Sequence, residues 1–336
     1  MSGVRCTNNR NSFKFLKKKI LCLFMLPVVM TLTGCGSNTY SMPYDSNYQV
    51  SSFKLVQTDN MQTTKPFASD LCVVDKDISN PGVSLNDVGA AALFDLGRGD
   101  TLYAKNANKQ LPPASITKVM TALVAMKHAS MDQVLTASDN VIITEPGAQL
   151  CGLKPGDSMT LDQALHIMLI HSANDVAVMI AEGVGDTVDG FVEMMNEEAR
   201  SLGATNCNFV NPNGLTAEGH YVTAYDLYLI FAEALKYDVF NEIIQMTTYN
   251  TTFTAKDGSD KTLDLNTLNL FLRGDYTAPD NITVIGGKTG TTNAAGHCLI
   301  LLSRDKSSNP YISVILNSAS TEDLYLKMTD LLEAIQ

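Results

Sequence analysis

Residues 112–126 read Pro-Pro-Ala-Ser-Ile-Thr-Lys-Val-Met-Thr-Ala-Leu-Val-Ala-Met. From Ile116 onward the apolar residues recur at helical spacing, so we expect a helix that begins beside Ser115. Residues three apart lie on one face of a helix, which would hold the Lys118 amine next to the Ser115 hydroxyl. A lysine can accept the serine proton only when burial or nearby cations keep the amine partly neutral. The stretch therefore predicts a nucleophilic serine with a lysine base at a helix N-terminus, whose positive end would stabilise a developing oxyanion.

The sequence on either side of this helix predicts a domain in two parts. Upstream, residues 88–96 and 101–104 predict a hairpin, because the glycines of Gly97-Arg98-Gly99-Asp100 permit a turn. Downstream, helical spacing predicts helices over residues 161–180, 188–202 and 224–234. Short β-branched runs predict strands at 282–285, 298–302 and 311–316, with a last helix over 321–335. We therefore expect an α+β fold, in which a sheet built from both ends of the chain meets a helical insert at a cleft.

Two further motifs complete an ordered set with Ser115. Ser172-Ala173-Asn174 follows the apolar helical residues 161–170, and Lys288-Thr289-Gly290 follows an apolar strand. Each motif is weak alone, because Ser-x-x-Lys and Ser-x-Asn recur elsewhere in the chain. Examples of such matches are 51–54, 303–306, 138–140 and 307–309. Neither of the two other Ser-x-x-Lys matches opens an apolar helix, and Ser138-Asp139-Asn140 follows Ser115 so closely that we expect a turn there.

The ordered set resembles the signature of the penicillin-recognising serine enzymes, which carry Ser-x-x-Lys, Ser-Asp-Asn and Lys-Thr-Gly. Further stretches resemble the low-molecular-mass D-alanyl-D-alanine carboxypeptidases in particular. These stretches are 153–157, 171–175, 211–215 and 218–221. The resemblance covers about residues 83–336. It implies a penicillin-binding-protein/β-lactamase-like transpeptidase fold, with an antiparallel sheet flanked by helices and a helical lobe.

The resemblance also implies four catalytic residues. Ser115 would attack the peptide carbonyl between two terminal D-alanines of a peptidoglycan stem peptide, and Lys118 would accept its proton. Ser172 would pass a proton to the leaving D-alanine, and Asn174 would orient Lys118 and the substrate amide. Water would then release the acyl group, so no cofactor and no metal are expected. Penicillins and other β-lactams would acylate the same serine and leave slowly.

Four neighbouring residues would bind the substrate. A cation and a hydroxyl suit a terminal carboxylate, and the resemblance assigns that role to Lys288 and Thr289. Gly290 would let the substrate backbone lie close to the strand. The amide of Thr291, together with that of Ser115, would form the oxyanion hole.

The N-terminus predicts export. Residues 1–34 contain four lysines ahead of an apolar run at 20–30, the pattern of a signal peptide. Leu32-Thr33-Gly34-Cys35 resembles a bacterial lipobox, which predicts lipidation of Cys35 and attachment to the outer face of the cell membrane. The alternative is an ordinary signal peptide with an incidental cysteine. The polar stretch at 35–82 is expected to be a tether, and 83–336 the enzyme domain. We expect the lipid to replace the C-terminal anchor that longer members carry after a β-rich second domain.

Charge and composition exclude several other functions. The first 34 residues hold six of the 24 Lys and Arg and none of the 35 Asp and Glu, so the mature chain is strongly acidic. Such a surface argues against nucleic acid as a partner. His220 and His297 are expected to be structural, and no metal motif is present. The sequence leaves open whether the cysteines after the leader form disulfides; they are Cys72, Cys151, Cys207 and Cys298.

Two other functions compete with a carboxypeptidase. A serine β-lactamase would share the nucleophile and the fold, but class A enzymes place a catalytic Glu-x-x-x-Asn between the second and third motifs, and none is found there. A non-catalytic β-lactam sensor or wall-binding lipoprotein would not need a complete set of reactive residues. The sequence does not decide the stem-peptide preference, the balance of carboxypeptidase and transpeptidase activity, the oligomeric state, or a role in growth as opposed to sporulation.

Overall fold

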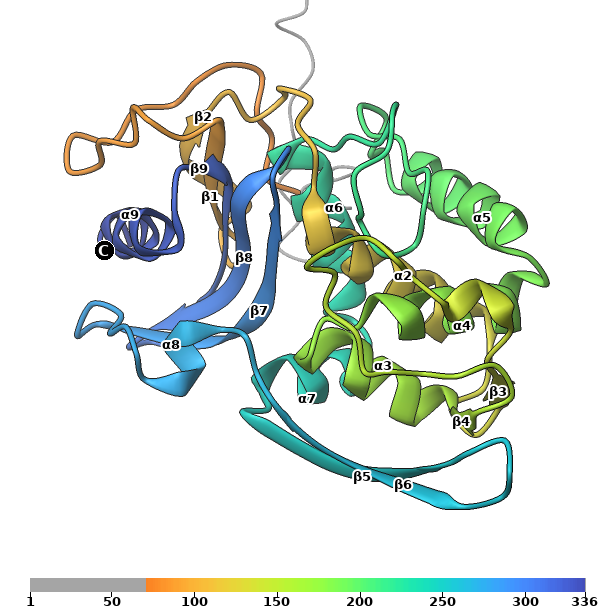
Figure 1. Ribbon diagram of the computed structural model, residues 1–336. Helices are drawn as coiled ribbons and strands as arrows, with labels where there is room; N and C mark the ends of the chain where they lie inside the picture. Colours follow the sequence, from red (N-terminus) through yellow and green to blue (C-terminus); the bar gives the residue numbers. More distant parts are fainter. Residues whose placement is uncertain (1–70, 336) are drawn as a thin grey trace, which may run out of the picture. The chain divides into compact units, whose positions relative to one another are not determined.

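A computed structural model describes residues 71–335 (Figure 1). Its main sheet is antiparallel, with the strand order β2-β1-β9-β8-β7. The strands are β1 (Ala90–Asp95), β2 (Asp100–Lys105), β7 (Ile282–Thr292), β8 (Gly296–Asp305) and β9 (Pro310–Ser318). Ala92 in the first strand pairs with Val314 in the last. The predicted sheet from both ends of the domain is therefore confirmed, and so is the α+β fold class.

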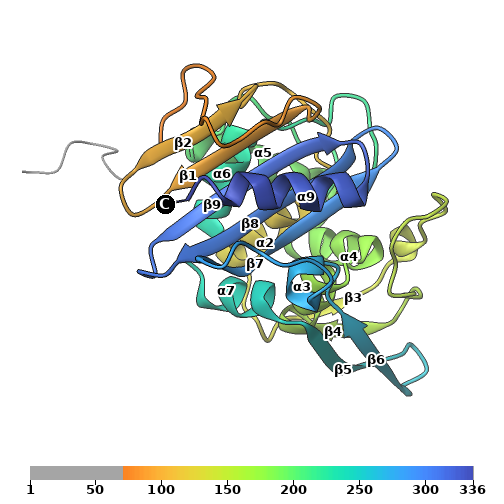
Figure 2. The ribbon, with the colours of Figure 1, turned by 90° about the vertical axis from the view of Figure 1, so that its left-hand side faces the viewer.

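Both faces of this sheet are covered, which explains the continuous apolar runs of its strands. Leu299, Leu301 and Ile315 pack with Leu324 and Met328 of the last helix, α9 (Thr321–Leu332). The alternate residues of the same strands pack against helices of the lobe on the opposite face, and include Ile300, Leu302 and Val314. Figure 2 shows α9 lying across its face of the sheet.

The helical lobe is built around one buried helix. α2 (Thr117–His128) is buried from Thr117 to Met126, on all its sides. The helices packed around it are α3 (Leu161–Ile170), α4 (Asn174–Gly185), α5 (Val188–Ser201) and α6 (Ala224–Ala234). A further helix, α7 (Asp238–Gln245), packs against α3 and β7. Because α2 is enclosed, Ser115, which lies just before its start, is open to solvent at the junction between the lobe and the sheet.

The expected helix over 161–180 is wrong as a single element. α3 ends at Ile170 and α4 begins at Asn174, and Ser172 between them has a left-handed φ of 62°. The apolar periodicity continued through the break because both helices bury a face in the same core. The break turns Ser172 and Asn174 toward the cleft, which one continuous helix could not do.

Helices were also expected to stop near residue 235, and the structure continues differently. After α7 a long hairpin of β5 (Thr248–Thr254) and β6 (Asp260–Asn266) joins the short strands β3 (Val134–Thr136) and β4 (Ser158–Thr160) in a second sheet. The Gln163 side chain of α3 contacts β5 by donating a hydrogen bond to the Thr252 carbonyl at 2.8 Å. The hairpin was missed because most of its Thr, Asn, Asp and Lys side chains face solvent and leave little apolar alternation. A short helix, α8 (Leu270–Arg273), then leads into β7.

The folded domain extends further toward the N-terminus than residue 83. Cys72 is buried and its amide donates to the Tyr228 hydroxyl at 2.9 Å, while Ile78 pairs with Ala104 at the edge of the sheet. The predicted leader, Cys35 and most of the predicted tether lie outside the described residues. Within 71–335, no helix is long and apolar enough to cross a membrane.

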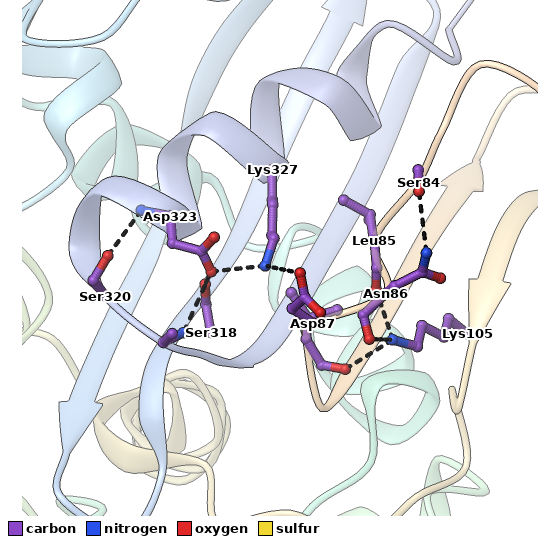
Figure 3. Close-up of polar contacts among 11 residues, drawn as sticks. Ser84, Leu85, Asn86, Asp87, Lys105, Ser318, Ser320, Asp323 and Lys327 are labelled. Carbon is purple, nitrogen blue, oxygen red and sulfur yellow. Dashed lines mark hydrogen bonds and ion pairs between the residues drawn. The ribbon is translucent and has the colours of Figure 1, made fainter.

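Two lysines, Lys105 and Lys327, contact the loop that precedes β1, and Lys327 comes from the last helix (Figure 3). Lys105 donates to the carbonyls of Leu85 and Asn86, both at 2.6 Å, and so holds the loop that precedes β1. Lys327 of α9 pairs with Asp323 at 2.8 Å and lies 3.9 Å from Asp87 of the same loop. These contacts hold the first loop against the last helix, on the face of the sheet away from the cleft.

Candidate active site

A cleft of about 360 Å³ lies where β7 meets the start of α2 and the α3–α4 break. Six of the predicted site residues line it, namely Ser115, Ser172, Asn174, Thr289, Gly290 and Thr291. Lys118 and Lys288 lie behind this surface, and both are buried. The motifs are thus brought together by three separate parts of the chain. Their chemical roles stay predictions.

The contacts of Lys118 fit the predicted transfer of a proton from Ser115. Its Nζ lies 2.8 Å from Ser115 Oγ, 2.7 Å from Asn174 Oδ1 and 2.6 Å from the Asn213 carbonyl oxygen. A neutral amine has two N–H groups and one lone pair, and the two carbonyl-type oxygens can only accept. In a neutral Lys118 the N–H groups would therefore go to Asn174 and Asn213, and the lone pair would face Ser115. In its neutral form Lys118 can only accept from the Ser115 hydroxyl, which is the arrangement of a general base.

The surroundings favour this neutral form. Burial, and after it the charge of Lys288, hold the pKa of the Lys118 amine well below its ordinary value, although the Asp175 carboxylate opposes the shift. Asp175 is largely engaged elsewhere, because it accepts hydrogen bonds from the amides of the 151–153 loop at 2.9–3.1 Å. The acid therefore anchors a loop of the cleft more than it holds a proton on Lys118.

Asn174 has its side-chain amide oriented by the backbone. Its Nδ2 donates to the Gln149 carbonyl at 3.0 Å, and its own N–H donates to the same oxygen at 2.8 Å. Because that carbonyl can only accept, Nδ2 must face it and Oδ1 must face Lys118. The positioning role that the sequence assigned to Asn174 has a structural basis in these contacts.

Lys288 lies behind Ser172. Its Nζ donates to Ser172 Oγ and to the Thr289 carbonyl, both at 2.9 Å, and the side chain is only 2% exposed. Burial lowers the pKa of Lys288 to about 7. Its charge therefore acts on the cleft through the Ser172 hydroxyl, and direct contact with a substrate carboxylate stays a prediction.

Gly290 brings β7 against the nucleophile. A Cβ added at this glycine would lie 2.9 Å from the Ser115 amide nitrogen and 3.1 Å from the Ala114 side chain. Only a glycine permits so close an approach, and it places the strand edge that carries Thr291 beside the Ser115 amide. This is the proximity that the predicted oxyanion hole requires.

Sequence reasoning missed a loop that wraps the nucleophile. The 208–221 loop is closed by backbone pairing of Asn208 with Tyr221. It supplies the Asn213 carbonyl to Lys118 and places Gly214 so close to Ala114 that an added Cβ would lie 1.9 Å from the Ala114 oxygen. The turn-forming run Asn211-Pro212-Asn213-Gly214 was visible in the sequence, but its contact with α2 bridges almost 100 residues and could not be read from it.

Other residues considered as candidates make structural contacts. Ser138 begins a short turn, as expected, and its hydroxyl and the Asn140 amide both bind Glu182 at 2.6 Å, away from the cleft. His297 contacts the hydroxyls of Thr291 and Thr321 at 3.3 and 3.1 Å. Among residues 71–335, the cysteines at 72, 151, 207 and 298 form no disulfide with one another. No group of His, Cys, Asp and Glu that could hold a metal occurs within residues 71–335.

The two-part fold and the convergence of Ser115, Lys118, Ser172, Asn174 and Lys288 on one cleft define the structural class of the penicillin-recognising serine enzymes. A model of the D-alanyl-D-alanine carboxypeptidase family matches residues 79–320, and the chain belongs to that family.

Individual relatives agree with this assignment. D-alanyl-D-alanine carboxypeptidase DacF of Bacillus subtilis is 33% identical over 254 residues, which cover 74% of this chain and 62% of that protein. DacC of Escherichia coli, with the same enzyme name, is 31% identical over 75% of this chain and 61% of its own length. The chain thus spans about three fifths of these relatives. A Streptomyces DD-transpeptidase structure superposes with a TM-score of 0.69 at 25% identity, covering 76% of this chain and 98% of that one.

The lowered pKa of Lys288 predicts how substrate affinity depends on pH. In the protein without substrate, the pKa of Lys288 is about 7, so the site loses a positive charge as the pH rises through 7. In Ser115→Ala, binding of a peptide ending in D-Ala-D-Ala is expected to weaken by up to about tenfold per pH unit above that point. Calorimetric titration from pH 6 to 9 measures this. The same peptide with a C-terminal amide is the control, and an equal pH dependence for both peptides would contradict the prediction.

Proposed function

We propose that the protein is a serine D-alanyl-D-alanine carboxypeptidase that removes the terminal D-alanine from peptidoglycan stem peptides through an acyl-enzyme. The observation that carries the proposal is the 2.8 Å contact of the buried Lys118 amine with Ser115 Oγ, beside a cleft that Ser115, Ser172 and Asn174 line. Family membership supports the substrate, since the relatives are named for this reaction.

The reaction would run in two stages. Ser115 attacks the carbonyl of the penultimate D-alanine while its proton passes to Lys118, and the oxyanion forms near the Ser115 and Thr291 amides. The proton then reaches the leaving D-alanine amine through Ser172, which Lys288 polarises at 2.9 Å. Water attacks the ester next and gives up a proton to Lys118. Lys118 passes that proton to Ser115 Oγ as the acyl–oxygen bond breaks, which restores both the serine and the neutral amine. β-Lactams would acylate Ser115 by the same first stage.

The test follows both stages in the full-length protein in detergent. A peptide ending in Lys-D-Ala-D-Ala and a fluorescent penicillin are supplied separately, beside Ser115→Ala. We expect D-alanine release and a long-lived penicillin adduct, both lost in the variant. Rapid penicillin turnover without D-alanine release would instead identify a β-lactamase. A stable adduct without turnover of either substrate would identify a sensor.

An acceptor competition extends the same assay, because the Streptomyces neighbour is named a DD-transpeptidase. A D-amino acid added to the peptide reaction can attack the acyl-enzyme in place of water. The ratio of exchanged to hydrolysed peptide then measures how the acyl group is divided between the two acceptors. We expect hydrolysis to dominate at low acceptor concentration.

We further propose that a lipid on Cys35 anchors the protein to the outer face of the cell membrane, after cleavage of residues 1–34. The lipobox-like Leu32-Thr33-Gly34-Cys35 and the preceding charged and apolar segments support this. Cys35→Ser is expected to abolish incorporation of a labelled fatty acid and to move the protein out of the membrane fraction. Cys22→Ser, in the same leader, is the control and should keep the label. Unchanged labelling of Cys35→Ser would refute the anchor.

A further inference from the structure

His220 is a buried histidine that the proposed reaction does not use. It is 5% exposed, and its Nε2 lies 3.1 Å from the hydroxyl of Thr117, two residues after the nucleophile. Its Nδ1 is buried and has no hydrogen-bond partner within the described residues. A buried nitrogen without a hydrogen-bond partner costs free energy. The contact between Nε2 and Thr117 is the polar contact that can offset this cost.

The Thr117 hydroxyl connects this histidine to the turn before the nucleophile. Its Oγ1 donates to the Ala114 carbonyl at 2.8 Å, and that donation uses the only proton of the hydroxyl. Thr117 Oγ1 can then only accept from His220, so the imidazole must carry its proton on Nε2 and leave Nδ1 bare. Burial lowers the pKa of His220 to about 4, which agrees with a neutral ring near pH 7.

Ala114 is held in a conformation that needs such support. Its φ is 48°, in the left-handed region that residues with a side chain seldom occupy. Its carbonyl is bound by Thr117 on one side and crowded by Gly214 on the other. The 208–221 loop that carries Gly214 also carries His220, so one loop restrains this carbonyl twice.

The Ala114 carbonyl and the Ser115 N–H belong to one peptide group. That group is planar and trans, so fixing the direction of the carbonyl fixes the direction of the N–H. The Ser115 nitrogen lies beside Gly290 of β7, so close that a Cβ added there would be 2.9 Å from it, and the oxyanion is expected to form near this point. A contact that fixes the direction of the Ala114 carbonyl therefore also fixes the direction of the Ser115 N–H, the expected donor to the oxyanion.

We propose that His220 is a positioning residue that acts through Thr117 and the Ala114 carbonyl to orient the Ser115 amide toward the developing oxyanion. The inference rests on the proposed function for the identity of the nucleophile. Because the oxyanion exists only in the transition state and intermediate, the contribution belongs to the rate of acylation and not to ground-state binding.

Stopped-flow acylation by a fluorescent penicillin, resolved into a dissociation constant and a first-order rate constant, tests this in the full-length protein. A lost oxyanion donor slows reactions by about 10²–10³, and a misaimed donor should cost less. We expect His220→Phe and Thr117→Val each to lower the first-order constant about tenfold or more, with little change in the dissociation constant. His220→Gln, whose amide can donate to Thr117, should restore most of the rate. His128→Phe, at the exposed end of α2, should match the wild type.

The double variant His220→Phe with Thr117→Val separates positioning from general destabilisation. Residues on one path are not additive, so the double variant should be no slower than the slower single variant, within a factor of about two. Multiplicative losses, a change confined to the dissociation constant, or wild-type rates in both single variants would overturn the proposal. Melting temperatures are measured in parallel, and a rate loss that follows them across all variants would overturn it as well.

A spectroscopic arm does not depend on activity. In Ser115→Ala, ¹⁵N spectra of His220, assigned by its loss in His220→Gln, should show a protonated Nε2 and a bare Nδ1 at pH 7. A proton on Nδ1 would refute the proposed path. If the wild type fails to be acylated at all, the proposed function fails, and this arm still tests the hydrogen-bond path.

Discussion

Replacing Lys118 by methionine is expected to slow both penicillin acylation and D-alanine release by about 10⁴-fold, because general base catalysis contributes up to that factor. Methionine fills a similar volume but has no lone pair to accept the Ser115 proton. The Asn174 and Asn213 oxygens, at 2.7 and 2.6 Å from Nζ, lose their donor at the same time. The fold should survive, since the residue removed is a buried amine whose charged form burial disfavours.

The measurement compares first-order acylation constants with circular dichroism spectra and melting temperatures. Lys109→Met is the control, because Lys109 is exposed and lies six residues before the nucleophile. Ser115 and Lys118 should act as one unit, so Ser115→Ala with Lys118→Met should be no less active than Ser115→Ala alone. A folded Lys118→Met variant that retains more than about a tenth of the acylation rate would show that another group takes the proton.

Gly214→Ala is expected to have the second largest effect, a loss of activity of about a hundredfold or more, comparable to the loss of an oxyanion donor. The added Cβ would lie 1.9 Å from the Ala114 oxygen and 2.8 Å from Thr117 Oγ1, so the peptide before Ser115 must move. A shift of that peptide misaligns both the nucleophile and its amide, which catalysis tolerates poorly.

Gly219→Ala provides a matched control for Gly214→Ala. Both glycines have left-handed φ values, 85° and 78°, in the same loop, so alanine is strained at either position. An added Cβ at Gly219 meets nothing closer than 3.8 Å. Backbone strain should therefore lower the stability of both variants, and the contact with Ala114 should add to the loss in Gly214→Ala. Only Gly214→Ala should lose acylation rate. Equal rate losses in the two variants would attribute the effect to backbone strain and not to contact with Ala114.

The sequence by itself determined the elements of the sheet and the reactive side chains. The strands near 282–316 carry dense apolar runs because they are buried on both faces, and that burial leaves a strong local signal. Ser115 and Lys118 lie one helical turn apart, so their contact is local as well. The choice of Ser172 over Ser138 could also be made from order and context along the chain.

Tertiary structure alone decided what surrounds those side chains. The break at Ser172 was hidden because the helices on both sides bury apolar faces in one core, and only packing in three dimensions decides where the backbone turns. The neutral state of Lys118 depends first on its burial and then on the charge of Lys288, 170 positions away in the chain. The amine also contacts the Asn213 carbonyl, from a loop 95 positions away. Burial, and contacts between distant segments, set proton affinities and backbone direction at this site, and neither leaves a periodic trace in the sequence.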